Sequence, residues 1–250
     1  MSADDVLLVE TLGEVQRVTM NRPDRLNALN QNLTIALLNY FEARRRDTAI
    51  RVIIVAGAGR GFSAGADLKA AGQPDALKDG PAGDWYLRDL MKAMRACPQP
   101  VIALVKGPAA GGGLAIALAS DVVVAGNSAR FHSAFIKVGL TGAELGVSWR
   151  LQRAMGLARA REMLLTGRPL DASEALQTGL VAAVVPDEEL DAHGMTLANA
   201  MLAARPDALR LTKRTLDAAL ETGSFDAAME IEERAQMLML ARAGRSGVVG

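Results

Sequence analysis

Two segments of the chain repeat the same order of a buried strand, a run of glycines and an apolar helix. Residues 52–61 read VIIVAGAGRG, and residues 101–113 read VIALVKGPAAGGG, about 50 residues further along. Nearly continuous apolar strands are typical of parallel sheets that are covered on both faces. The repeat therefore predicts an α/β fold built from stacked units in which helices flank a parallel sheet.

The rest of the chain fits this class. Residues 6–11 (VLLVET) and 15–20 (VQRVTM) predict two strands joined by a turn at Gly13, and Asn30 is a candidate N-cap for the next helix. From Trp149 onward the pattern is mostly helical. We expect a core over residues 1–195 and a helical C-terminal region over residues 196–250. Residues 72–84, rich in Gly, Pro and Asp, predict a mobile loop.

Composition excludes several classes of function. The 250 residues carry 28 basic and 28 acidic side chains, so net charge gives no argument for a nucleic-acid partner. No apolar run approaches the length of a membrane span. The single cysteine, Cys97, excludes an intrachain disulfide and a cysteine-based metal cluster. The acidic start, MSADD, lacks the apolar segment of a signal peptide, and we expect a cytoplasmic protein without a metal.

The glycine-rich turns offer backbone N–H groups at helix N-termini, where a ligand's oxygen is readily bound. A dinucleotide fingerprint fits poorly, because Phe62 stands where its third glycine belongs. Two such turns that converge on one carbonyl oxygen would instead form an oxyanion hole. The alternative is that the glycines only allow a helix to pack closely on the sheet. The helix after the second turn, residues 114–120, carries no acid or base, so proton transfer must come from elsewhere.

Four segments together resemble the enoyl-CoA hydratase/isomerase (crotonase) family: NRPDRLNALN, GRGFSAGADLKA, KGPAAGGGLAIALASDVVVAG and REMLLTGRPLDASEALQTGLVAAVVP. They occur in the family's order and spacing, and the resemblance covers the chain from about Val6 to the C-terminal helices. It implies a spiral of stacked ββα turns with a helical C-terminal part that forms a homotrimer or a dimer of trimers. It also implies acyl-CoA thioester substrates, with coenzyme A part of the substrate and no separate cofactor.

The resemblance also assigns residues by position. Ala66 and Gly112 would supply the two oxyanion amides. Coenzyme A would lie along Arg25 and Leu26, with its adenine toward Ala64, Ala66 and Asp67 and its phosphates near Lys69.

This chain departs from the family's hydratases at the two catalytic glutamates. Their positions match Ala115 and Phe135 here, and neither side chain can transfer a proton. The segment GLTGAELGVSW supplies one substitute, Glu144, in a loop similar to one that carries an acidic proton-transfer residue in the family's dienoyl-CoA isomerases. The acyl pocket would be formed by Ala115, His132, Phe135 and Trp149.

Three functions remain open at this point. An isomerase would use Glu144 alone to move a proton between two carbons of an enoyl thioester. A hydratase would use Glu144 with another group, such as His132, to hold water. A non-catalytic acyl-CoA binding protein would keep the oxyanion amides and lack the acid/base pair.

Overall fold

The computed structural model describes residues 6–67 and 82–245, whose strands form two sheets. The larger sheet has the order β1-β2-β3-β4-β6-β9, and the smaller has the order β5-β7-β8. The strands are β1 (Leu7–Leu12), β2 (Val15–Met20), β3 (Val52–Gly57), β4 (Val101–Val105), β5 (Pro108–Ala110), β6 (Val122–Gly126), β7 (Arg130–His132), β8 (Leu170–Asp171) and β9 (Ala183–Val185). Of the loop expected at residues 72–84, residues 72–81 lie outside the described part of the chain.

The helices run mostly between these strands. They are η1 (Pro23–Arg25), α2 (Gln31–Arg44), α3 (Ala82–Ala96), α4 (Gly112–Ala119), η2 (Ala134–Val138), α5 (Val147–Met155), α6 (Leu157–Thr166), α7 (Ala172–Gln177), η3 (Asp187–Glu189), α8 (Leu190–Leu202), α9 (Pro206–Glu221) and α10 (Phe225–Arg245). Asn30 caps α2, because its side chain accepts a hydrogen bond from the N–H of Leu33. That N-cap prediction is confirmed.

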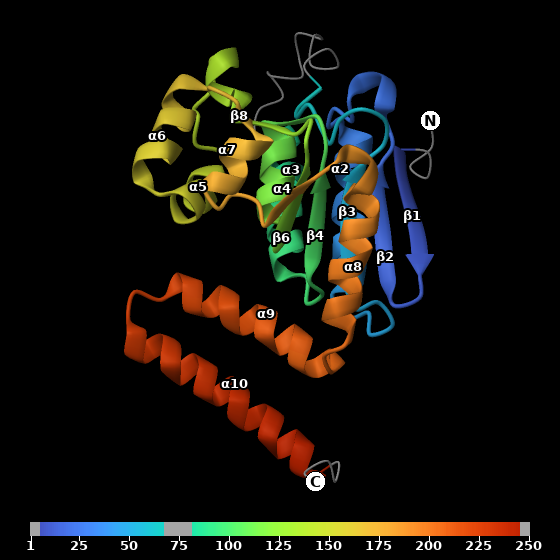
Figure 1. Ribbon diagram of the computed structural model, residues 1–250, viewed down its shortest axis with the longest axis vertical. Coiled ribbons are helices and arrows are strands. Elements are labelled where there is room, and N and C mark those ends of the chain that lie inside the picture. The colour runs from blue at the N-terminus through green and yellow to red at the C-terminus, as the bar shows by residue number, and fades with distance from the viewer. Residues whose placement is uncertain (1–5, 68–81, 246–250) are drawn as a thin grey trace.

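The larger sheet is parallel from β2 to β9, and β1 joins β2 in an antiparallel pair through the turn at Gly13. Every residue of β3 and β4 is buried. Alternate side chains serve opposite faces: Ile53 and Val55 pack toward α2, α3 and α4, whereas Val52 and Ile54 pack toward α8 (Figure 1). The apolar strands are thus covered on both faces, as the sequence predicts.

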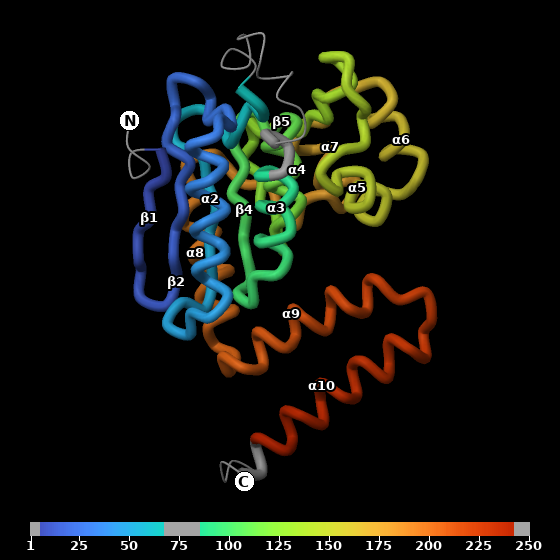
Figure 2. The backbone as a smooth tube through the Cα atoms, turned by 180° about the vertical axis from the view of Figure 1, so that it is seen from behind, coloured from blue at the N-terminus to red at the C-terminus, as the bar shows by residue number. Residues whose placement is uncertain are grey.

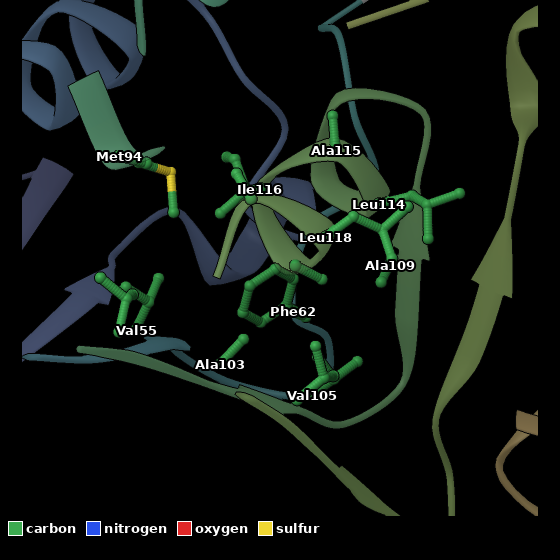
Figure 3. Packing of buried hydrophobic residues seen from close by; sticks show 14 of the residues in the cluster. Val55, Phe62, Met94, Ala103, Val105, Ala109, Leu114, Ala115, Ile116 and Leu118 are labelled. Atoms are coloured by element: carbon green, nitrogen blue, oxygen red, sulfur yellow. The ribbon is translucent and has the colours of Figure 1, made fainter. Parts of the chain in front are cut away.

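Helix α4 is buried along its whole length. Figure 3 shows the ring of Phe62 between α4 and the β4 side chains Ala103 and Val105, while Ala115 lies on the far side of α4 from that ring. One side of α4 therefore completes the core, and another side is available to a site.

The C-terminal helices leave the core after α8. Helix α8 packs on the sheet through Leu190 and Ala198, so the boundary expected at residue 195 falls inside this helix. Lys213 links helix α9 to the core. Its buried Nζ lies 2.7 Å from Asp121 Oδ2 and donates to the Gln99 carbonyl at 2.9 Å. Helix α10 lies against α9 and away from the sheet (Figures 1 and 2).

In the described part of the chain, no helix combines the length and apolar character that crossing a membrane requires.

Candidate active site

The two glycine-rich turns lie side by side. They follow β3 and β4, which are parallel neighbours, so both turns emerge at the same edge of the sheet. The N–H of Ser63 donates to the Pro108 carbonyl at 2.9 Å, and the N–H of Ala110 donates to the Ser63 carbonyl at 2.9 Å. We call residues 63–67 and 108–113 the amide wall.

Close backbone contact explains two glycines of the amide wall. Gly65 has φ +84°, and a Cβ atom there would lie 2.5 Å from the Ala110 carbonyl oxygen and 3.3 Å from the Gly112 nitrogen. A Cβ atom on Gly113 would lie 2.5 Å from the Ser63 carbonyl oxygen. Glycine is needed at both positions because the backbones of the two turns are in contact.

Two N–H groups of the amide wall are free to bind a ligand. Gly112 is the first residue of α4, so its N–H has no acceptor within the helix. Leu29 donates to the Gly65 carbonyl at 2.7 Å and accepts from the Asp67 N–H at 3.1 Å, and this pairing turns the N–H of Ala66 away from Leu29. Neither N–H donates to another group among residues 6–67 and 82–245. Both suit an oxygen that gains negative charge.

Asn27 holds the preceding loop against the first turn. This fully buried residue has φ +53°, a conformation that asparagine tolerates better than most residues. Its Nδ2 donates to the carbonyls of Ala58 at 2.9 Å and Gly61 at 2.8 Å, and its Oδ1 accepts from the N–H of Arg22 at 2.8 Å. Residues 22–29 are thereby fixed beside the amide wall.

Three residues expected along coenzyme A lie in or against this loop. The N–H of Ala64 donates to the carbonyl of Leu26 at 2.9 Å, and Leu26 adopts a left-handed conformation with φ +49°. Arg25 is exposed at the end of η1. The fold thus brings Arg25, Leu26 and Ala64 to one edge of the amide wall.

Asp67, expected on the adenine side of coenzyme A, has a partner within the protein. Its carboxylate forms an ion pair with Arg22 at 2.9 Å, and only 10% of the side chain is exposed. Arg22 also donates to the carbonyl of Ala28, so the pair ties the loop to the amide wall. Lys69 lies outside the described residues.

A cavity of about 520 Å³ lies along the side of α4 that carries Ala115, Leu118 and Ala119. Its lining comes from α3, α4, α5, the last residue of α9 and the loop before α5. Ala115, Glu144 and Trp149 all contribute to it. Ala115 lies one helical turn after Gly112, so the cavity begins next to the amide wall.

Glu144 belongs to a tightly turned loop, residues 143–147, which we call the carboxylate wall. Leu145 and Gly146 both have positive φ values, +53° and +78°. The carbonyl of Glu144 accepts from the N–H of Val147 at 2.9 Å, and its Oε1 accepts from the N–H of Leu145 at 3.2 Å. The half-buried carboxylate therefore has a defined position in the lining of the cavity.

Two residues expected in the acyl pocket do not line this cavity. The Nε2 of His132 lies 2.7 Å from the Gly167 carbonyl oxygen, so this imidazole serves a structural contact between β7 and the loop after α6. The Phe135 ring packs over Gly111, 3.7 Å from where a Cβ would be. Phe135 shields the glycine turn, whereas Ala115 and Trp149 line the cavity.

Cys97 lies apart from the site. Burial raises the pKa of its thiol, and its Sγ lies 2.9 Å from Gln99 Oε1. Within the described residues, no cluster of histidine, cysteine and carboxylate side chains is arranged to hold a metal.

Cationic side chains in the cavity were missed by sequence reasoning. Arg88, Lys92 and Arg95 lie along one face of α3, and Arg150 projects from α5. The spacing of the three α3 residues, at i, i+4 and i+7, indicates a shared face. Nothing in the sequence shows that α5 packs opposite that face.

A family model and the sequences of known proteins were compared with this chain, and both indicate the same family. The family model described as enoyl-CoA hydratase/isomerase matches residues 10–247. A probable enoyl-CoA hydratase of Mycobacterium bovis is 40% identical over 240 residues, which cover 94% of this chain and 84% of the relative.

Two solved structures are similar as well. A monofunctional enoyl-CoA isomerase from M. smegmatis is 39% identical, covers 90% of this chain and 98% of its own, and has a TM-score of 0.78. A putative enoyl-CoA hydratase from Thermobifida fusca YX in complex with acetoacetyl-CoA is 31% identical, covers 96% of both chains and has a TM-score of 0.86.

Proposed function

The chain belongs to the enoyl-CoA hydratase/isomerase family of acyl-CoA-processing enzymes, and from that membership we propose that it isomerises the double bond of an enoyl-CoA thioester. The proposal rests on Glu144, a carboxylate that lines the same cavity as Ala115. The amide wall would bind the thioester oxygen through the N–H groups of Ala66 and Gly112. The acyl chain would extend from there into the cavity.

The reaction needs only one carboxylate. Glu144 removes a proton from the carbon α or γ to the thioester carbonyl, and the C–H electron pair moves into the conjugated system. Negative charge then falls on the thioester oxygen, where the Ala66 and Gly112 N–H groups stabilise it. The carboxyl group returns the proton to the other carbon, which shifts the double bond and regenerates the carboxylate.

Hydration is less well supported. The family's two hydratase glutamates are replaced by Ala115 and Phe135, and the imidazole of His132 is engaged with Gly167. Glu144 therefore has no second acid or base nearby among the sequence candidates with which to hold a water molecule.

We place the coenzyme A end along Arg25, Leu26, Ala64 and Ala66, and the phosphates near Lys69. Exposed Arg25 suits an anionic group, and the T. fusca relative was solved with an acyl-CoA. Coenzyme A belongs to the substrate, and the proposal needs no other cofactor. The buried, free Cys97 fits a cytoplasmic location.

We also propose a homotrimer or a dimer of trimers. Helices α9 and α10 expose large apolar side chains, among them Leu216, Phe225, Met229 and Leu240, each at least half exposed. Apolar patches of this kind mark surfaces that other chains cover. Sedimentation at several concentrations tests the association.

Incubation in deuterated water tests the proposed reaction. With 2-enoyl and 3-enoyl thioesters, we expect deuterium exchange at carbon and interconversion of the two substrates without net hydration. Glu144→Gln keeps size and polarity but cannot titrate, so kcat should fall by roughly 10²–10⁴ while acyl-CoA affinity stays nearly unchanged.

Glu221→Gln is the matched comparison, because Glu221 is the other carboxylate that lines this cavity. If deuterium exchange is lost in Glu221→Gln and kept in Glu144→Gln, the group that transfers the proton is Glu221. If the wild type binds acyl-CoA tightly and turns over no enoyl thioester, the binding-protein interpretation replaces isomerisation.

A further inference from the structure

The cavity follows α4 from Ala115, one turn past Gly112, toward the helix C-terminus. Ala115, Leu118 and Ala119 line it in succession, so it continues past the first turn of α4. At a rise of 1.5 Å per residue, Ser120 lies about 12 Å along the helix axis from Gly112. A chain whose carbonyl is held at Gly112 would therefore have its far end near Ser120.

Arg150 lies at that far end. Its Nη2 donates to the Ser120 carbonyl at 3.3 Å, and the side chain lines both this cavity and a neighbouring one of about 340 Å³. Burial lowers the pKa of the guanidinium, and the nearby charge of Arg95 lowers it further. The arginine nevertheless remains a cation at neutral pH.

No carboxylate lies within ion-pair distance of Arg150 among the described residues. The two carboxylates whose charge acts on Arg150 already have cationic partners: Asp217 pairs with Arg95 at 2.5 Å, and Asp121 pairs with Lys213 at 2.7 Å. The cavity's own carboxylates are Glu144 and Glu221, against four cationic side chains. The far end of the cavity thus holds a partly desolvated cation without a matching anion.

We propose that the acyl chain of the substrate carries a carboxylate at its distal end and that Arg150 binds it. The inference rests on the proposed function, because it takes the cavity as the acyl site. A guanidinium recognises a carboxylate through two parallel charge-assisted hydrogen bonds, which are stronger than bonds between neutral groups. Trp149 would contact the chain on the way, with Arg95 and Arg153 stacked 5.7 Å and 4.1 Å from its ring centroid.

A purely structural role for Arg150 is the competing explanation. A cation at the C-terminal end of a helix is stabilised by the helix dipole and by the last carbonyl groups. In that case the loss of Arg150 would lower the stability of the fold and would reduce the affinity for charged and neutral ligands equally. The two explanations differ in whether Arg150 favours acyl chains that end in a charged group over acyl chains that end in a neutral group.

The test measures the affinities of two saturated acyl-CoA thioesters of equal chain length by calorimetry. One ends in a methyl group and the other in a carboxylate, and neither can react by a double-bond shift. We expect the wild type to bind the carboxylate-ended thioester roughly 10–100-fold more tightly, as one charge-assisted interaction allows. Arg150→Gln should abolish this preference, and Arg150→Lys should retain part of it.

Arg153→Gln is the matched control. Arg153 lies one helical turn after Arg150 and contacts Trp149, but it does not line the acyl cavity. Its loss should leave the preference unchanged.

The comparison of the two thioesters can be made on the wild-type protein alone, so it does not depend on whether a variant folds. Equal affinities for the two thioesters would overturn the inference and leave the proposed function standing, whereas no binding of either would remove the proposed function itself. An equal loss of affinity for both in Arg150→Gln would assign Arg150 to the fold alone.

Discussion

The amide wall and the carboxylate wall are built on different principles. The amide wall presents backbone N–H groups, and two contacting turns, buried glycines and the side chain of Asn27 hold it in place. The carboxylate wall presents one side chain from a short loop with two consecutive left-handed residues. The amide wall depends on the path of the backbone, and the carboxylate wall depends on the identity of one residue, Glu144.

Because of this difference, the groups proposed to bind the thioester and the group proposed to determine the type of reaction lie in different segments and can change independently. The N–H groups of Ala66 and Gly112 belong to the backbone, so under the proposed function a substitution that leaves the two turns intact would also keep the binding of the thioester oxygen. The position of the acid or base can change without disturbing the amide wall. Here the two hydratase positions hold Ala115 and Phe135, and a carboxylate stands in a later loop instead.

The largest expected effect comes from Gly65→Ala. The new Cβ would lie 2.5 Å from the Ala110 carbonyl oxygen, and backbone cannot move aside as a flexible side chain can. We expect the free energy of unfolding to fall by about 3 kcal/mol. In the folded fraction kcat should fall by roughly 10²–10³, because the neighbouring amides shift. Urea unfolding and enoyl thioester turnover measure the two effects.

Gly146→Ala is the control from the carboxylate wall. Gly146 also has a positive φ, but a Cβ there meets nothing within 4 Å. Only the conformational penalty of about 1–2 kcal/mol should appear. Equal losses of stability in the two variants would show that contact between the turns does not hold the amide wall.

Asn27→Ala should have an intermediate effect. It leaves one buried carbonyl, one partly buried carbonyl and one N–H without their partner, so the free energy of unfolding should fall by roughly 2–3 kcal/mol. Asn30→Ala removes a single capping bond at α2 and should lower it by only about 1 kcal/mol. Thermal and urea unfolding compare them. A smaller loss for Asn27→Ala than for Asn30→Ala would contradict this account of the loop.

The smallest effect on stability is expected for Leu145→Gly. Glycine relieves the left-handed strain at φ +53° and loses a partly buried contact, so stability should change by less than about 1 kcal/mol. The carboxylate wall gains freedom, and kcat should fall roughly tenfold as Glu144 loses its fixed position. An unchanged kcat would mean that Leu145 does not orient Glu144.

Local sequence signals predicted the elements well. The glycine turns, the strands that precede them and the N-cap Asn30 depend on neighbours in the chain, and the structure has them where the sequence indicates. Glu144 lies in the lining of the cavity because loop 143–147 leads directly into α5, which packs near α4, and its role in proton transfer stays a prediction.

Side-chain partners distant in sequence could not be predicted. Asp67 turns to Arg22 and His132 turns to the Gly167 carbonyl, and neither contact leaves a pattern in the sequence. The cations of the cavity come from α3 and α5, which are brought together only by the tertiary fold. The boundary expected at residue 195 falls inside α8, because the Ala- and Leu-rich sequence of this helix does not show that it packs on the sheet.

The backbone origin of the two free N–H groups decides what a scan by alanine substitution can detect. Position 66 is already alanine, so a scan has nothing to change there. At position 112 a new Cβ would lie 2.8 Å from the Leu29 side chain, so the scan would report crowding while the N–H remains. Such a scan would test Glu144 and pass over the two N–H groups proposed to bind the thioester oxygen, which only proline or an ester in place of the amide can remove.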